Sequence, residues 1–317
     1  MPVNPDRRSL LLALGACGLA AVTPAIAAKP VPLFKRIRRP LGVQLYALGD
    51  AAKNDLFGTL RKLAAMGYRD FELPSLYGRD PKDLKADADR AGVRFGSMHM
   101  GLPERLPPGS LTLMSSPQQI ADALGALGVS KAVLPIPLLP ATYNPAGGRA
   151  ALIAGVEAGG LEMWKRMGGL LNERAAALKP QGIALGYHNH NMEFRPQEGT
   201  TGWDVLLKEL DPKLVFIELD LGWYAAAGLD PAAEILRLKG RIKMVHLKDI
   251  KATTQPNYTL GQDPVEVGLG MLDWRKILPA CVAAGVEHYY VEQEPPFVRD
   301  RFDSMKLSHD FLASFTA

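Results

Sequence analysis

From residue 41 onward, short apolar runs alternate along the chain with stretches that have the periodicity of an amphipathic helix. The apolar runs are rich in β-branched and aromatic residues and predict strands at 41–48, 68–73, 93–100, 131–137, 183–190, 214–221, 242–249 and 288–294. The stretches between them predict helices at 56–67, 81–92, 116–128, 163–180 and 271–285. Glycines stand where helix C-caps are expected, just before the next strand, at Gly67, Gly92, Gly128, Gly182 and Gly285.

This alternation predicts a parallel sheet with crossover helices, which is an α/β fold. Eight such units within about 275 residues fit a closed (β/α)₈ TIM barrel better than an open doubly wound sheet. A dinucleotide-binding sheet would also need G-x-G-x-x-G after its first strand, and LYALGDAAKN at 45–54 lacks it. We therefore expect one TIM-barrel domain over residues 41–317.

Residues 1–28 predict an export signal that precedes the barrel. Arg7 and Arg8 precede a modest apolar stretch, and residues 25–27 fit an A-x-A cleavage pattern. The paired arginines favour a twin-arginine signal, so the expected location is periplasmic or exported, without stable membrane insertion after processing. Lipidation at Cys17 of LGAC ranks second because the apolar stretch continues past it, and a membrane-anchoring helix also ranks behind cleavage.

Composition excludes some partners and leaves others open. The net charge of +4 is mild, and the basic run at 34–40 is not interleaved with aromatic residues, so no nucleic acid partner is expected. The two cysteines, Cys17 and Cys281, leave no intramolecular disulfide once the signal is removed. A homo-oligomer is compatible with the sequence.

Titratable residues gather at the ends of the predicted strands, which is where barrel enzymes keep their chemistry. In each of the last four strands two of them are spaced i, i+2, so both members share one face. The cost of burying so many charges favours a divalent cation as compensation. A single strand histidine or carboxylate would more often be structural, but four consecutive strands indicate function. The residues are Glu72, His99, His188, His190, Glu218, Asp220, His246, Lys248, Glu292 and Glu294.

Five ordered motifs resemble the sugar phosphate isomerase/epimerase, or xylose isomerase-like, TIM barrel superfamily over residues 41–313. They are HNHNMEF (188–194), ELDLGW (218–223), VHLKD (245–249), VGLGMLDW (267–274) and VEQE (291–294). The resemblance implies one divalent ion held by four residues of the last four strands. With the export signal expected at residues 1–28, this chain would be an exported member of the group. Manganese is the favoured ion, with zinc, cobalt and iron as alternatives.

The resemblance assigns the ligands residue by residue. Asp220, His246 and Glu292 match the last three ligands of the superfamily, with Glu294 as the alternative to Glu292. Where many members have glutamate as the first ligand, this chain has His188. Two opposed glutamate bases, which epimerases of the group use, are therefore not both present.

Further roles follow from the same reading. Glu292, His190 and Lys248 are the catalytic candidates, for proton transfer and for stabilising negative charge. Glu193 would supply the missing carboxylate or anchor its loop, and Trp223 would stack on a sugar or pack in the core. The candidates for substrate binding are Glu72, His99, Glu193, Trp223 and Glu294.

The first functional hypothesis is a metal-dependent isomerase or epimerase that converts a non-phosphorylated keto-sugar through an enediolate. The runner-up is a lyase or hydratase of 3-keto-glycosides or of their elimination products, because histidine replaces one glutamate. A non-catalytic periplasmic carbohydrate-binding protein is the alternative from another class, and it predicts an eroded ligand set. An endonuclease of the same superfamily would need more metal-binding histidines and a basic groove, and the sequence indicates neither.

Overall fold

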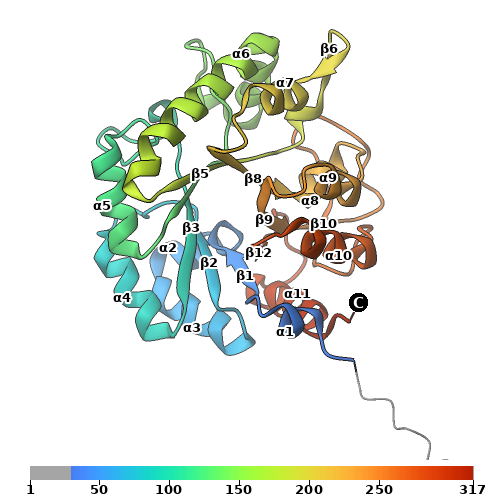
Figure 1. The fold of residues 1–317 in the computed structure, drawn as a ribbon. Coiled ribbons are helices and arrows are strands. Elements are labelled where there is room, and N and C mark those ends of the chain that lie inside the picture. The colour runs from blue at the N-terminus through green and yellow to red at the C-terminus, as the bar shows by residue number, and fades with distance from the viewer. Residues whose placement is uncertain (1–29, 317) are drawn as a thin grey trace, which may run out of the picture. The chain divides into compact units, whose positions relative to one another are not determined.

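Eight parallel strands pair side by side and close into a barrel in the order β1-β2-β3-β4-β5-β8-β9-β12 (Figure 1). The predicted (β/α)₈ TIM barrel is thus confirmed. The computed structural model describes residues 30–316, so the predicted signal segment and Cys17 lie outside the described residues. The barrel strands are β1 Gly42–Gln44, β2 Asp70–Leu73, β3 Arg94–His99, β4 Lys131–Leu134, β5 Ala184–His188, β8 Val215–Asp220, β9 Ile242–Leu247 and β12 His288–Val291.

Helices surround the strands, and two short antiparallel ribbons decorate the loops (Figure 1). The ribbons pair β6 Pro196–Gln197 with β7 Thr200–Thr201, and β10 Asp249–Ile250 with β11 Pro264–Val265. Among the described residues, no helix combines the length and the apolar character that a membrane span needs. The helices are α1 Leu33–Ile37, α2 Asp50–Asn54, α3 Leu56–Met66, α4 Pro81–Ala91, α5 Pro117–Leu127, α6 Gly148–Leu178, α7 Gly202–Glu209, α8 Leu221–Ala226, α9 Pro231–Arg237, α10 Trp274–Ala284 and α11 Arg301–Ser314.

Local sequence explains why α5 begins and ends where it does. The Ser116 side chain accepts a hydrogen bond from the backbone N–H of Gln119, whose own side chain accepts from the Ser116 N–H. This capping box satisfies N–H groups that the first helical turn leaves without partners. At the other end, Gly128 adopts the left-handed conformation that the predicted C-cap requires.

Most barrel strands are a few residues shorter than predicted, and two elements differ most from their predicted lengths. β1 stops at Gln44 because the Gln44 side chain accepts a hydrogen bond from the backbone N–H of Tyr46 and starts a 3₁₀ turn. Helix α6 begins at Gly148, well before the predicted residue 163, and is kinked at Gly160, which has φ 54°.

The barrel interior is built in layers. Phe216, Met244 and Tyr290 lie inside it with Val133 and form a small apolar cluster. Two positions further along lie Glu218 on β8, His246 on β9 and Glu292 just past the end of β12. An apolar layer is therefore followed by a polar layer toward the carboxyl ends of the strands.

Glycines make room for the large rings of the apolar layer. A Cβ atom on Gly186 would lie 2.3 Å from the ring of Phe216, and one on Gly96 would lie 2.4 Å from the Tyr290 hydroxyl. The strands can therefore close around bulky side chains only because these positions carry none.

Candidate metal centre and cavity

His246 of β9 lies at the middle of the polar layer and is fully buried. Its Nδ1 lies 2.8 Å from Glu292 Oε2 and 3.6 Å from Asp220 Oδ2. Its Nε2 lies 2.7 Å from Glu72 Oε2 and 3.3 Å from Glu218 Oε2. The two nitrogens of one imidazole therefore face two different pairs of carboxylates.

The four predicted ligands come together on the Nδ1 side. Ligand atoms of Asp220, His246 and Glu292 lie within 4.8 Å of one another, and His188 Nε2 lies 3.9 Å from Asp220 Oδ2. Ligands about 2.1 Å from an ion are roughly 3–3.5 Å apart, so these separations suit a divalent cation. Asp220 Oδ2 is buried, and its nearest ion-pair partner is Lys248 Nζ at 2.9 Å, so this oxygen already faces a positive charge where a cation would bind.

Lys248 shares these carboxylates. Its Nζ lies 2.9 Å from Asp220 Oδ2, 3.0 Å from Glu292 Oε2 and 3.2 Å from Glu294 Oε1. Burial disfavours its charge, but the three carboxylates outweigh burial and raise the pKa of Lys248 well above its usual value. The lysine ammonium is therefore a built-in positive charge beside the candidate ion site.

A second set of donors lies on the Nε2 side of His246. Ligand atoms of His99, His188, Glu218 and His246 lie within 4.8 Å of one another. Glu218 Oε2 is 3.0 Å from His99 Nε2 and 3.1 Å from His188 Nδ1. These donor types also suit a cation. The carboxylates of this second set orient the imidazoles of His188 and His246, which also belong to the four predicted ligands on the Nδ1 side.

The histidines of this second set differ in charge. Burial opposes protonation of His99, but Glu72 and Glu218 outweigh it and raise the pKa of His99 to about 9. For His188, burial and the neighbouring His246 lower the pKa despite the contact with Glu218. Without an ion, His99 is thus cationic and His188 neutral at neutral pH. Glu218 and Glu292 outweigh burial and raise the pKa of His246 as well, so a cation that binds its Nδ1 would displace a proton.

Two residues predicted to bind substrate do not reach a cavity. Glu72 is fully buried and accepts hydrogen bonds from Gln44 Nε2 and Ser97 Oγ. Glu193 is also fully buried, and its Oε1 accepts from the Tyr187 hydroxyl at 2.7 Å and from the His190 N–H at 3.0 Å. Glu72 supports His246, and Glu193 anchors the loop after β5.

Six of the other predicted side chains line a cavity of about 670 Å³ at the carboxyl ends of the strands, whereas Asp220, His246 and Lys248 do not line it. Trp223 is buried, its ring lies 5.6 Å from that of His190 and 5.0 Å from Lys248 Nζ, and its Nε1 has no hydrogen-bond acceptor. Burial, followed by the charges of His188 and Lys248, lowers the pKa of His190 well below its usual value. The predicted residues that line the cavity are His99, His188, His190, Trp223, Glu292 and Glu294.

Several residues of the site were not predicted from the sequence. Gln44 and Ser97 hold Glu72, and the Tyr290 hydroxyl lies 3.0 Å from Ser97 Oγ. The sequence pattern places Glu218 two residues before Asp220 but predicts no separate role for it. A polar residue at the inward position of an otherwise apolar strand is the signal that could have found them.

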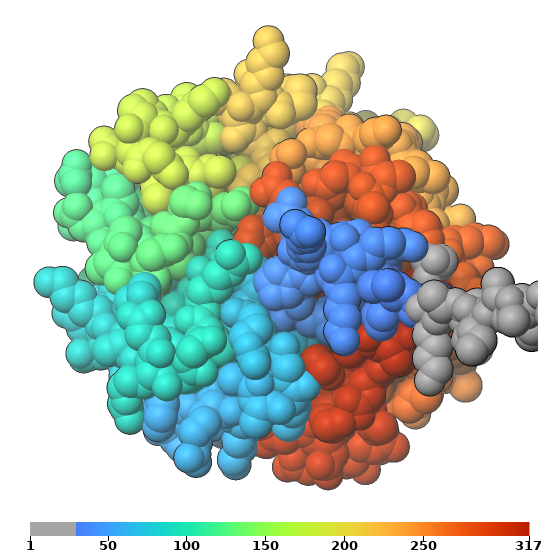
Figure 2. Space-filling view, turned by 60° about the horizontal axis from the view of Figure 1, so that its bottom comes forward, coloured from blue at the N-terminus to red at the C-terminus, as the bar shows by residue number. Residues whose placement is uncertain are grey.

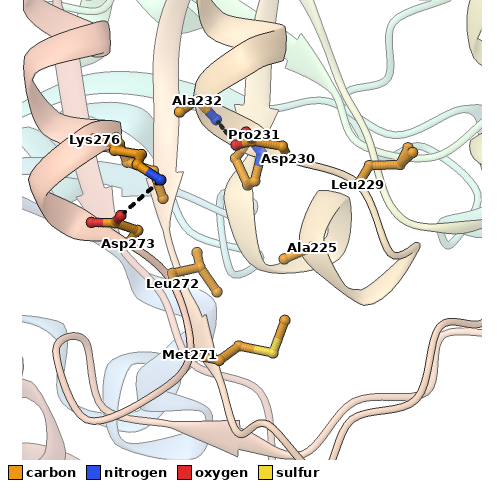
Figure 3. Close-up of a pocket in the computed structure, with 10 residues that line it drawn as sticks. Ala225, Leu229, Asp230, Pro231, Ala232, Met271, Leu272, Asp273 and Lys276 are labelled. Atoms are coloured by element: carbon orange, nitrogen blue, oxygen red, sulfur yellow. Dashed lines mark hydrogen bonds and ion pairs between the residues drawn. The ribbon is translucent and has the colours of Figure 1, made fainter.

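A second, smaller cavity of about 200 Å³ lies between the end of α8, the start of α9 and the start of α10 (Figure 3). Its polar groups already have partners. Asp230 caps α9 by accepting from the Ala232 N–H at 2.9 Å, and Lys276 pairs with Asp273 at 3.4 Å. The larger cavity is therefore the candidate for chemistry.

Comparison with known proteins agrees with this geometry. A family model described as "Xylose isomerase-like TIM barrel" matches residues 60–314. Inosose dehydratase of Geobacillus kaustophilus is 26% identical over 208 residues, which cover 64% of this chain and 64% of that protein, slightly less than two thirds of its length. Inosose dehydratase of Clostridium tetani is 36% identical over 90 residues, covering 28% of this chain and 30% of that protein.

Among solved structures, a sugar phosphate isomerase/epimerase from Parabacteroides distasonis superposes with a TM-score of 0.66. It is 26% identical, and the match covers 87% of this chain and 94% of that chain. The similarity therefore extends over nearly the whole barrel.

Proposed function

Because the chain belongs to the xylose isomerase-like TIM barrel family, we propose that it is a metal-dependent enzyme that removes the proton beside the carbonyl of a keto-sugar. The observation that carries the proposal is the convergence of His188, Asp220, His246 and Glu292 beside a cavity. These four residues would hold the ion. A divalent cation bound there would act as a Lewis acid on a substrate oxygen, with manganese favoured.

The chain's own residues supply the proton transfers. The charges of Lys248 and His246 outweigh burial and hold the pKa of Glu292 well below its usual range, so Glu292 is an ionised acceptor for the carbon-bound proton. His99 lines the cavity and is protonated at neutral pH, because its pKa is about 9. His99 is thus a proton donor, and neutral His190 is a second acceptor.

This arrangement favours elimination of water, or its reverse, hydration. Both carboxylates that line the cavity, Glu292 and Glu294, follow the same strand, β12. The imidazoles of His99, His188 and His190 come from β3 and β5. A carboxylate can remove a proton on one side while an imidazolium protonates a departing hydroxyl, whereas symmetric epimerisation would use matched bases. The dehydratase names of the curated relatives support this choice.

Isomerisation or epimerisation is the second candidate, supported by the name of the Parabacteroides distasonis structure. Both candidates start with the same proton abstraction. The twin-arginine-like start of the sequence supports an exported enzyme, and hence sugars that carry no phosphate.

The test is exchange of the carbon-bound proton with deuterated solvent across a panel of keto-sugars and inososes, with manganese present. Wild-type protein should exchange the proton beside the carbonyl, and Glu292→Gln should lose exchange by roughly 100-fold or more. Glu287→Gln, which removes a carboxylate that pairs with Lys131 and Lys243 outside the cavity, is the matched control and should exchange like wild type. Absence of exchange with every compound would favour the non-catalytic carbohydrate-binding alternative.

A further inference from the structure

The cavity continues past the metal centre to a wall formed by the loops after β3 and β4. Arg105, in the 3₁₀ turn Pro103–Arg105, and Arg149, in the first turn of α6, both line it. Tyr143 lies between them in the chain, with its ring 5.7 Å from the Arg105 guanidinium carbon. This wall is therefore rich in positive charge.

Neither arginine has a counterion within residues 30–316. Other arginines of the described chain do form ion pairs, among them Arg79, Arg90, Arg94, Arg195, Arg237 and Arg299. Arg105 Nη1 is buried and has no hydrogen-bond acceptor. A guanidinium remains charged at every physiological pH, so a buried N–H of this kind is costly until an acceptor arrives.

The cavity is electrically divided. Its lining carboxylates are Glu292 and Glu294, both next to the metal centre, while the arginine wall carries none. The N-terminus of α6 also meets this wall at Gly148 and adds the positive end of a helix dipole. A ligand that spans the cavity would place a neutral, oxygen-rich part at the ion and an anionic part at the arginines.

The size of the cavity allows such a ligand. A volume of about 670 Å³ lies well inside the range of about 300–1,000 Å³ that holds drug-sized ligands, and exceeds what one sugar ring fills. Gln262, on the loop after β9, lines the cavity with both amide atoms buried and without partners. Its amide can serve hydroxyl groups between the two ends.

We propose that Arg105 and Arg149 form an anion subsite, and that the substrate is a keto-sugar derivative carrying a carboxylate, and no phosphate, at the end remote from the reacting carbonyl. The assignment rests on the proposed function for the identity of the sugar part. The planar fork of a guanidinium matches the two oxygens of such a group.

The test compares keto-sugars that differ only in one substituent: hydroxymethyl, carboxylate or phosphate. Wild-type protein should prefer one anionic compound over the neutral one in kcat/KM for deuterium exchange by roughly 10- to 100-fold, and added salt should reduce the preference. A preference for the phosphate would contradict the proposed substrate, and the expected preference is for the carboxylate. Arg105→Gln and Arg149→Gln should raise KM for it and abolish the preference.

Arg275→Gln is the matched control, because Arg275 is an exposed residue of α10 that does not line the cavity. It should keep the wild-type preference, and Arg105→Lys should restore part of what Arg105→Gln loses. Equal rates for neutral and anionic compounds, or an unchanged preference in both glutamine variants, would overturn the subsite. If no compound exchanges, calorimetric binding of hexuronate, hexose phosphate and hexose to wild type and Arg105→Gln decides the subsite independently of catalysis.

Discussion

At the scale of single residues, Lys248 and a metal ion would compete for the same oxygens. The lysine Nζ lies 2.9 Å from Asp220 Oδ2 and 3.0 Å from Glu292 Oε2, and both carboxylates are also candidate ligands. The lysine therefore stabilises the carboxylates when no ion neutralises them, and its charge weakens the attraction for a cation that does.

Replacing Lys248 by methionine should separate these two effects. Removal of one partner from a buried ion pair costs roughly 3–5 kcal/mol, so the variant in EDTA should unfold at a lower temperature than wild type. Manganese should then raise its Tm by more than it raises that of wild type. Lys243→Met, at a pair with the partly exposed Glu287, is the control and should respond like wild type. Equal manganese-induced shifts in Lys248→Met and wild type would contradict the competition.

Glu193 should make stability fall as pH rises. Burial raises its pKa from 4.5 to about 7, although hydrogen bonds from His190 and Tyr187 oppose the shift. The folded state then holds a proton that the unfolded state has released, so stability declines between about pH 4.5 and pH 7, by up to about 3 kcal/mol.

Glu193→Gln should remove this component while its amide oxygen still accepts both hydrogen bonds. The variant should match wild type near pH 5 and exceed it in free energy of unfolding at pH 8, measured with urea. The exposed Glu198→Gln is the control and should follow the wild-type curve. A Glu193→Gln protein that tracks wild type from pH 5 to pH 8 would refute the assignment.

The positions of single residues could be predicted where they belong to an ordered sequence motif. They could not be predicted where they depend on a contact across the barrel. Asp220, His246, Glu292 and His188 do converge, as their ordered motifs indicated. The partner of His246 on its other side, Glu72, lies 174 positions away along the chain. Its role depends on side-chain conformations inside the closed barrel, which local sequence does not encode.

At the scale of elements, the register of β5, β8 and β9 places a residue of the apolar layer and a residue of the polar layer two positions apart. Gly186 of β5 faces the ring of Phe216, and His188 follows two residues later. Any shift of β5 should therefore move the His188 side chain at the candidate metal centre and also disturb the packing around Phe216.

Gly186→Ala should be destabilising by about 1–3 kcal/mol, because its Cβ would lie 2.3 Å from the Phe216 ring. It should also weaken metal binding through His188.

Gly125→Ala is the opposite case: nothing lies within 4 Å of its Cβ in the exposed face of α5, so it should be stabilising by about 0.5–1 kcal/mol. Urea unfolding and manganese titration check both, and a Gly186→Ala protein as stable as wild type would contradict the layered interior.

Most elements were predictable because their apolar positions repeat with the period of a helix or a strand. Helices α1, α2, α7, α8 and α9 are short and were not predicted. Two predicted elements differ in length for local reasons. β1 ends early through one side-chain hydrogen bond of Gln44. The first half of α6 is rich in alanine and glycine, so residues 148–162 lack the regular large apolar side chains that reveal a helix.

At the scale of the whole molecule, closure of the barrel creates the site. Tyr290 of β12 pairs with Gly42 of β1 on one side and His246 of β9 on the other. The number of strand–helix units predicted this closure, but the cavity could not be predicted. Its walls come from loops such as those of Arg105, Arg149 and Gln262, whose paths follow no hydrophobic period.

The first and last helices of the described barrel lie in contact, with the N–H of Leu33 donating to the carbonyl oxygen of Phe315 at 2.8 Å. Figure 2 shows this junction as blue atoms against red ones. A short peptide could bridge it, and new ends could be opened at the exposed Gly199 of the β6–β7 turn. Such a circularly permuted chain would be synthesised with Asp220, His246 and Glu292 ahead of His188. The same candidate metal centre should thus form whatever the order of its ligands along the chain.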